Sequence, residues 1–198
     1  MFVTFEGLDG SGKSTQAQLL AEALAADGRE VVATREPGGT ELGERVRELI
    51  LAGGDVAPWA EAALFAAARA QLVEEVIAPA LGRGADVISD RYLDSSLAYQ
   101  GIARGLGLER VLGLNLHAVR GLLPDRTYLL LIDPHESLQR IGEAGDRIER
   151  ENDEFRARVD AAYRELAQTF PQRIAAIDGT RPPREIAEEV LDELRQHS

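Results

Sequence analysis

Short apolar runs alternate with longer amphipathic segments along the whole chain. The short runs are β-branched or strongly apolar, and they predict buried strands over residues 2–5, 31–34, 87–89, 128–132 and 174–177. The longer segments carry apolar residues at i, i+3 and i+4, and they predict helices over residues 12–26, 41–51, 58–81, 108–120, 155–169 and 183–195. Strands and helices that alternate in this way are typical of a parallel sheet covered by helices on both faces.

This pattern and the length of the chain predict one domain. The 198 residues are enough for one α/β domain with a sizeable core, and no repeat, low-complexity stretch or linker divides them. We therefore expect a single domain over residues 1–198, of the α/β class, with a doubly wound five-stranded parallel sheet flanked by helices.

The segment between the first strand and the first helix has the form G-x-x-x-x-G-K-S, the pattern of a P-loop NTPase. Its glycines let backbone N–H groups converge on phosphate oxygens, and the helix N-terminus adds partial positive charge. Lys13 is expected to reach the β- and γ-phosphates, Ser14 to bind Mg²⁺, and Thr15 to help at the α-phosphate. The pattern predicts ATP or GTP binding but does not say what the triphosphate is for. The loop residues are Gly7, Leu8, Asp9, Gly10, Ser11, Gly12, Lys13 and Ser14.

Lys13 is also the one lysine in a chain whose lysines and arginines number 22. A chain that uses arginine at every other cationic position has a lysine inside its glycine-rich loop. A compact ammonium suits that place, where a planar guanidinium would not fit. The composition therefore supports the same interpretation as the motif.

Two polar clusters follow predicted strands. Asp90 and Arg91 come directly after the strand at residues 87–89, and Arg35 precedes a Glu-Pro-Gly-Gly-Thr turn after the strand at residues 31–34. In an open parallel sheet, the ligand crevice lies at the carboxyl ends of the strands. We expect Asp90 to hold Mg²⁺ or its waters there, and Arg91 and Arg35 to bind phosphoryl oxygens.

Further candidates lie on predicted helices. Phe65 and Arg69 are four residues apart and share a helix face, while Ser96, Tyr99 and Gln100 share another. An aromatic ring, a guanidinium, an amide and two hydroxyls are suitable for stacking on a base and reading its edge. Phe65 considered alone is more typical of a core position than of a base platform.

Charge and composition exclude several classes of protein. The net charge is −12 and no basic stripe stands out, which disfavours a polymeric nucleic-acid partner. The absence of cysteine excludes disulfides, thiolate metal sites and cysteine nucleophiles. The N-terminal residues do not resemble a signal peptide, and no apolar run approaches the roughly 18–20 residues that span a bilayer. We expect a cytoplasmic protein with no membrane contact.

With these motifs, the sequence resembles the thymidylate kinases, which use ATP to phosphorylate dTMP to dTDP. The resemblance runs from Phe2 to about Ala167. Beyond the P-loop it is carried by residues 34–40 (Thr-Arg-Glu-Pro-Gly-Gly-Thr), 64–69 (Leu-Phe-Ala-Ala-Ala-Arg), 90–92 (Asp-Arg-Tyr), 94–101 (Asp-Ser-Ser-Leu-Ala-Tyr-Gln-Gly) and 146–149 (Asp-Arg-Ile-Glu).

The resemblance implies a role for each candidate in binding dTMP. Arg35 and Arg91 would hold its phosphate, with Asp9 near that phosphate and the 3′-hydroxyl. Tyr99 would lie under the sugar, where a ribose 2′-hydroxyl would clash. The residues implied for the base are Phe65, which would stack on thymine, Arg69, which would donate to a thymine carbonyl, and Gln100 and Ser96, which would contact the base edge.

The resemblance also implies a mobile lid and a homodimer. The lid would span about residues 138–150 and supply Arg140 and Arg147 to the transferred group, with glycines that favour motion. Glu143 and Glu149 leave open a structural ion pair for Arg147. Pairing would use an alanine-rich helix face, which could also lie on the protein's own sheet and comprises Ala62, Ala63, Ala66, Ala67 and Ala70.

Two alternatives remain open at this stage. Another deoxynucleotide or deoxynucleoside P-loop kinase would share the phosphate loop, although a nucleoside gives Arg35 no phosphate to bind. A guanine-specific P-loop switch would need Asn-Lys-x-Asp, which this sequence lacks because its single lysine is Lys13.

Overall fold

The computed structural model describes residues 1–51, 54–141, 147–148 and 150–197 of the chain. Five parallel strands form one sheet in the order β2-β3-β1-β4-β5, as the alternating pattern predicts. The strands are β1 (Phe2–Gly7), β2 (Val31–Arg35), β3 (Asp86–Asp90), β4 (Arg126–Leu131) and β5 (Ile174–Asp178).

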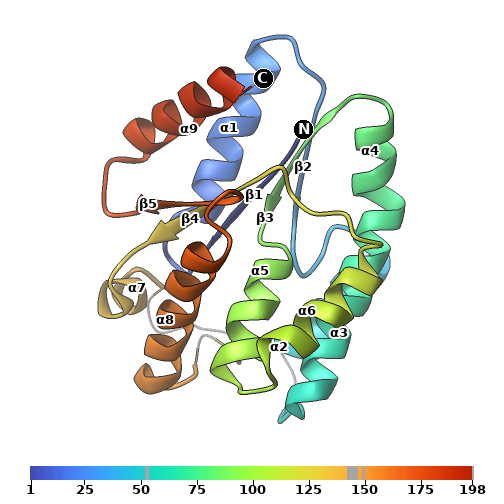
Figure 1. Cartoon of the computed structure of the whole chain (residues 1–198), viewed down its shortest axis with the longest axis vertical. Coiled ribbons are helices and arrows are strands. Elements are labelled where there is room, and N and C mark those ends of the chain that lie inside the picture. The colour runs from blue at the N-terminus through green and yellow to red at the C-terminus, as the bar shows by residue number, and fades with distance from the viewer. Residues whose placement is uncertain (52–53, 142–146, 149, 198) are drawn as a thin grey trace.

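Helices cover both faces of the sheet (Figure 1). On one face, α1 (Lys13–Ala26) and α9 (Pro183–His197) pack together over an apolar cluster that includes Phe5, Leu20 and Val190. The other face is covered by the helical segments between α3 and the end of α8, over a cluster that includes Leu72, Leu97 and Leu166. The helices of this second layer are α3 (Pro58–Leu72), α4 (Ala78–Gly82), α5 (Leu93–Ser96), α6 (Leu108–Ala118) and α8 (Asp153–Thr169).

The predicted helix at residues 58–81 is continuous in the structure, but it changes from α-helical to π-helical and back again. A π-helical segment, Val73–Ile77, joins α3 to α4, and a second one, Leu97–Ala103, continues α5. Periodicity alone does not reveal such segments, because one wider turn shifts the apolar stripe without ending it. Segments of this kind are frequent near functional sites, and the second one carries Tyr99 and Gln100.

Two further helices stand beside the sheet's carboxyl end. α2 (Glu41–Leu51) packs on α3, and α7 (Pro134–Ile141) lies against the P-loop. The sequence did not predict α7 as a helix, since residues 138–141 were assigned to the lid. Of that predicted lid, residues 142–146 and 149 lie outside the described residues, so its Gly142, Glu143, Gly145, Asp146 and Glu149 are not located.

The predicted alanine face is divided between two sides of α3. Ala62 and Ala66 are buried in the protein, whereas Ala63 and Ala67 are exposed and Ala70 is half-buried. The reason is the helical period, since residues at i and i+1 point about 100° apart. Within the described residues, no helix is long and apolar enough to cross a membrane.

Candidate active site

Strand register brings the two predicted polar clusters beside the P-loop. β1 pairs with β3 so that Phe5 faces Asp90, and β2 pairs with β3 so that Arg35 also faces Asp90. The P-loop begins two residues after Phe5. The carboxyl ends of three strands therefore meet where the phosphate-binding loop enters α1.

The P-loop has the backbone shape of a phosphate cradle. Gly12 precedes α1 with φ 96°, and a Cβ built on it would meet nothing within 4 Å, so there is open space in front of the helix N-terminus. Gly10 has φ 75°, and a Cβ there would lie 2.9 Å from the Ser137 carbonyl oxygen of α7. Both positions favour glycine because of their backbone conformation, and Gly10 does so also because α7 packs closely against it.

Lys13 lies folded over this loop. Its side chain is buried, Nζ donates to the Leu8 carbonyl oxygen at 2.8 Å, and the Asp9 carboxylate is 3.9 Å away. Burial and the nearby Arg91 charge lower the pKa of Lys13 to about 8, although Asp9 and Asp90 oppose the shift. The nearest carboxylate, that of Asp9, is 3.9 Å from Nζ, so the ammonium can still receive phosphate oxygens as closer partners.

Ser14 and Asp90 meet as the sequence predicts. Ser14 Oγ donates to Asp90 Oδ2 at 2.5 Å, and the other Asp90 oxygen, Oδ1, is buried without a hydrogen-bond partner among the described residues. Mg²⁺ takes oxygen ligands and is commonly held by one or two protein groups together with substrate phosphates. These two side chains fit that donor set. In the described part of the chain, no three His, Cys, Asp or Glu residues gather into a larger metal site.

Arg91 is held from several sides. Its Nη1 donates to Gly7 O, Ser95 Oγ and Tyr163 Oη at 2.9–3.1 Å, and its Nη2 donates to Asp9 at 2.5 Å. Burial raises the pKa of Asp9, but the charges of Arg91 and Lys13 outweigh it and hold that pKa at about 2. Asp9 therefore remains a carboxylate at neutral pH and fixes the guanidinium at the edge of the P-loop.

A buried carboxylate that sequence analysis missed supports this arrangement. Glu6 is fully buried in β1 and accepts from Tyr92 N, from both Ser95 N and Oγ, and from Tyr163 Oη. The sequence did contain a signal for this residue, because an acidic side chain stands inside an apolar strand just before the P-loop. Through Ser95 and Tyr163, Glu6 orients two of the groups that accept from Arg91.

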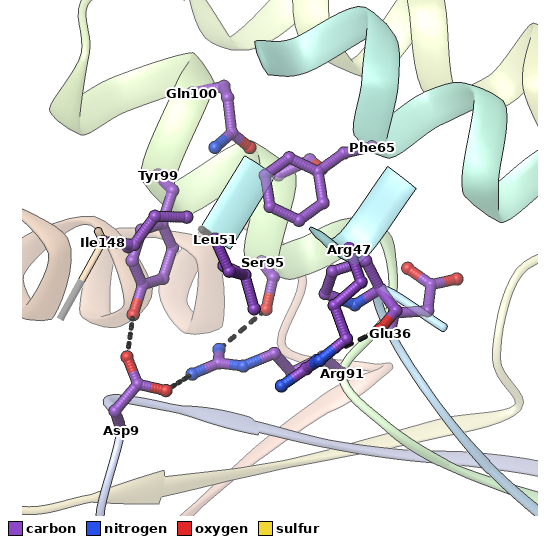
Figure 2. Close-up of a pocket in the computed structure, with 12 residues that line it drawn as sticks. Asp9, Glu36, Arg47, Leu51, Phe65, Arg91, Ser95, Tyr99, Gln100 and Ile148 are labelled. Atoms are coloured by element: carbon purple, nitrogen blue, oxygen red, sulfur yellow. Dashed lines mark hydrogen bonds and ion pairs between the residues drawn. The ribbon is translucent and has the colours of Figure 1, made fainter. Parts of the chain in front are cut away.

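An open pocket lies beside the P-loop, bounded by α2, α3 and the α5 region (Figure 2). Phe65 stands on one wall and Tyr99 on another, and Gln100 lies between them at the inner end. Tyr99 Oη lies 3.4 Å from Asp9, and the Arg91 guanidinium lies 5.5 Å from the centre of the Tyr99 ring. The lining residues are Asp9, Glu36, Pro37, Arg47, Leu51, Phe65, Arg91, Ser95, Ser96, Tyr99, Gln100 and Ile148.

Arg47 was missed by the sequence analysis. It comes from α2, half-buried, and its Nη1 donates to the Pro37 carbonyl oxygen at 3.1 Å. Its guanidinium reaches the same end of the pocket as Arg91 (Figure 2). The amphipathic pattern predicted α2 but not that this arginine turns inward. Two cations at one end of the pocket are suited to an anionic group.

Arg35 stands outside this lining. Its side chain is exposed, and Nη2 donates to both oxygens of Glu44 at 3.0 and 3.1 Å. The predicted phosphate contact of Arg35 therefore stays a prediction, and it requires the guanidinium to exchange Glu44 for the phosphate. An exposed ion pair of this kind is weak, so that exchange costs little.

Arg69 lies behind the pocket wall rather than in its lining. It is 1% exposed, and its donors contact Glu36, Ser96, Asn115 and the Tyr92 carbonyl. Ser96 lines the pocket and accepts from Arg69 at 3.1 Å, so its own hydroxyl proton is available for another acceptor. A direct contact between Arg69 and thymine stays a prediction that needs one of these bonds to be exchanged.

The two predicted lid arginines go to different places. Arg140, in α7, donates to the Gly10 and Gly179 carbonyl oxygens at 3.3 and 3.4 Å, beside the P-loop. Arg147 instead donates to Ile50 O at 2.8 Å and to the buried carboxylate of Glu61, on the pocket side. In the conformation described, Arg147 thus forms an ion pair with Glu61. Glu143 and Glu149, the partners named from the sequence, lie outside the described residues.

Comparison with known proteins assigns the family. The model of the family described as thymidylate kinase matches residues 5–190. The chain belongs to the thymidylate kinase family. A thymidylate kinase of Leifsonia xyli subsp. xyli is 54% identical over 194 residues, which cover 96% of this chain and 92% of that protein. A thymidylate kinase of Bifidobacterium longum is 52% identical over 185 residues, covering 91% of this chain and 90% of its own.

A solved structure agrees with the family assignment. The crystal structure of thymidylate kinase from Ehrlichia chaffeensis superimposes with a TM-score of 0.81 at 35% sequence identity, over 98% of each chain. The P-loop NTPase fold predicted from the glycine-rich motif is thereby confirmed. The roles assigned to individual site residues remain predictions from the sequence and geometry of this chain.

Proposed function

We propose that the chain transfers the γ-phosphoryl of ATP to dTMP, giving ADP and dTDP on the route to dTTP. The observation that carries this proposal is the pocket beside the P-loop, with Arg47 and Arg91 at one end and Phe65 and Gln100 at the other. A nucleoside monophosphate presents an anion and a flat base at its two ends, and this pocket offers partners for both. Family membership agrees with that assignment.

The donor side is the P-loop. Its backbone N–H groups and Lys13 would bind the β- and γ-phosphates of ATP. Ser14 and Asp90 would hold Mg²⁺, and that ion supplies neutralisation of charge on the phosphate oxygens. Arg140 contacts Gly10 of the P-loop and Gly179, and this position favours a contact between its guanidinium and the nucleotide. Residues 1–198 would act as one kinase domain whose lid spans about residues 138–150.

On the acceptor side, Arg91 and Arg47 would bind the dTMP phosphate, joined by Arg35 if it leaves Glu44. Phe65 would stack on thymine, and Tyr99 would lie under the deoxyribose and leave no room for a 2′-hydroxyl. Deoxynucleotides would then be selected by exclusion of the ribose form. Asp9 would keep Arg91 in place beside the transferred group.

The reaction needs no covalent enzyme intermediate. A phosphate oxygen of dTMP forms a bond to the γ-phosphorus, the bond from that phosphorus to the β,γ-bridging oxygen breaks, and its electron pair stays on ADP. The side chains must hold both phosphates in line and neutralise the charge that shifts between them. Lys13 and Arg91 stand on the two sides of this transfer, and Asp9 contacts both.

A homodimer is the proposed assembly. The exposed alanines of α3, Ala63 and Ala67, would let a second copy approach closely, and α6 packs beside α3. Sedimentation of the wild-type chain and of a variant with Ala67→Arg tests this. A dimer that the substitution splits supports the interface, whereas a monomeric wild type rules it out.

The test of the catalytic proposal follows the transferred atom. ATP labelled in its γ-phosphate should pass that label to the β-position of dTDP, with one ADP formed for each dTDP. Lys13→Ala serves as the control that removes phosphate binding. Label recovered only as inorganic phosphate would mean that the chain is a hydrolase, and the proposed function would be wrong.

A further inference from the structure

One buried carboxylate next to the pocket has no role in the proposed reaction. Glu61 lies in the first turn of α3, is 0% exposed, and is surrounded by side-chain donors. Gln100 Nε2 donates to its Oε1 at 2.8 Å, and Arg104 donates to both oxygens at 2.7 and 3.1 Å. Arg147 Nη2 completes the set at Oε2.

Glu61 is held in its ionised form. Burial raises the pKa of this carboxyl, but the hydrogen bonds from Arg104, Arg147 and Gln100 together bring that pKa below its ordinary value. An ionised carboxylate has no proton to donate, so each of its partners must be a donor. The two arginines therefore ensure that Glu61 accepts from Gln100 and never donates to it.

This fixes which end of the Gln100 amide faces the pocket. A flipped amide would set its oxygen against the Glu61 carboxylate, so that two buried acceptors face each other and the amide oxygen has no donor there, which is costly. With the nitrogen on Glu61, the Gln100 oxygen lies on the side of Phe65, as Figure 2 shows. Among the described residues, none donates to that oxygen, so the pocket presents a hydrogen-bond acceptor beside the aromatic ring.

An acceptor at this point distinguishes pyrimidine bases. Thymine and uracil carry a proton on N3 and can donate to it, whereas cytosine has a bare N3 that would face the oxygen as a second acceptor. We propose that Glu61 is a positioning residue for substrate specificity, which sets the orientation of the Gln100 amide so that the pocket accepts N3–H pyrimidines and rejects cytosine. This inference rests on the proposed function, because it concerns the base of the same acceptor nucleotide.

The decisive substitution is Glu61→Gln. An amide has one oxygen and one NH₂ group, so either of its orientations loses two of the four bonds described and no longer fixes the amide of Gln100. Once Gln100 can flip, its NH₂ group can face the bare N3 of cytosine. We expect the ratio of kcat/KM for dTMP to that for dCMP to fall roughly ten-fold or more in this variant. The ratio for dTMP to dUMP should not change, since both bases carry N3–H.

A matched control separates base reading from general damage. Glu151 accepts from the same Arg104 at 2.8 Å but does not contact Gln100 among the bonds described. Glu151→Gln should therefore leave the dTMP-to-dCMP ratio unchanged. A double-mutant cycle gives the mechanism: in a Gln100→Leu background, Glu61→Gln should produce no further change in the ratio, because the group it orients is absent.

The outcomes are distinct. If wild type prefers dTMP to dCMP and Glu61→Gln leaves that preference intact, the inference is wrong while the proposed function stands. If wild type phosphorylates neither nucleotide, the proposed function itself fails. Should the variant turn over too slowly for kinetics, calorimetric titration with dTMP and dCMP measures the same ratio from binding. A ratio that changes equally in the Gln100→Leu background would also overturn the inference, since Glu61 would then act by another route.

Discussion

Arg91 donates to Asp9 across 2.5 Å, and this ion pair fastens the end of β3 to the P-loop. Arg91 also has φ 72°, a left-handed backbone conformation that a residue with a side chain adopts at a cost of about 1–3 kcal/mol. The four acceptors around its guanidinium hold it there. Backbone and side chain thus place one cation at the edge of the P-loop, beside the pocket.

Replacing Arg91 should stop transfer while leaving ATP binding. Arg91→Gly keeps the left-handed backbone without strain and removes the guanidinium, so we expect kcat/KM for dTMP to fall by about 10²–10³. The affinity for ATP, measured by calorimetric titration, should change little because the P-loop is intact. Arg91→Lys should not restore activity, since a point charge cannot bridge Asp9, Ser95 and a phosphate together. Full activity in either variant would remove Arg91 from the proposed site.

Arg47 should act on dTMP binding. Arg47→Ala should raise KM for dTMP by roughly ten-fold and leave KM for ATP unchanged, as expected for the loss of one charge-assisted bond to the acceptor phosphate. Arg45 is the matched control on the same helix, because it is exposed and pairs only with Glu41 among the contacts described. Arg45→Ala should change neither constant. An unchanged KM in the Arg47 variant would show that its place in the pocket wall is structural.

The charge on Lys13 gives a pH dependence. Its pKa of about 8 in the unliganded protein means that affinity for ATP should weaken as pH rises through about 8. An unfolded lysine keeps its proton to about 10.5, so the unfolded chain binds more protons between these values. The free energy of unfolding therefore gains a contribution from Lys13 as pH rises from about 8 to about 10.5. Calorimetric ATP titrations across this range measure the first effect, and an affinity that stays constant as pH rises through about 8 would contradict it.

Arg69 should matter for stability as well as for the pocket. Arg69→Met removes the cation from Glu36 and the donor from Asn115 and Ser96, and we expect the free energy of unfolding to fall by about 3–5 kcal/mol. Arg83→Met is the control, because Arg83 pairs with Glu30 in an exposed bridge and should cost less than about 1 kcal/mol. Denaturant unfolding of both variants measures the difference. Equal and small losses of unfolding free energy in the two variants would show that the buried network around Arg69 does not stabilise the protein.

Glu36 adds a pH signature to the same network. Burial raises the pKa of Glu36 to about 7, although the charge of Arg69 opposes this. The folded protein therefore binds more protons than the unfolded chain between pH 4.5 and about 7, and Glu36 makes stability decline as pH rises through that window. Glu36→Gln should flatten this part of the stability profile. A profile that stays unchanged would contradict the raised pKa.

The features that the sequence predicted well are those written in local patterns. The strands at residues 2–5 and 87–89 are short apolar runs, and the glycine-rich loop between strand and helix has a spacing that few other structures require. Parallel pairing then brings Asp90 beside the loop, because the carboxyl ends of neighbouring strands meet at one edge. The local sequence pattern, together with the rule that parallel strands end at one edge of the sheet, was enough to predict that the P-loop and Asp90 lie together.

The remaining features depend on contacts between distant residues. Arg147 pairs with Glu61, which lies 86 positions earlier in the chain, and its contact with the transferred group stays a prediction. Arg69 lies behind Ser96 and pairs with Glu36, and its contact with thymine stays a prediction. A sequence pattern says that a cation is present on a helix but not which carboxylate it will meet, so these placements required the structure.

ADP release from ATP and Mg²⁺, with dTMP, dUMP, thymidine, dCMP and UMP offered separately at equal concentration, shows whether dTMP is the acceptor. We expect the fastest turnover with dTMP, slower turnover with dUMP and near-background rates with UMP, whose 2′-hydroxyl would meet Tyr99. Turnover with thymidine but not with dTMP would contradict this expectation, because a pocket ending in Arg47 and Arg91 would then have no phosphate to bind.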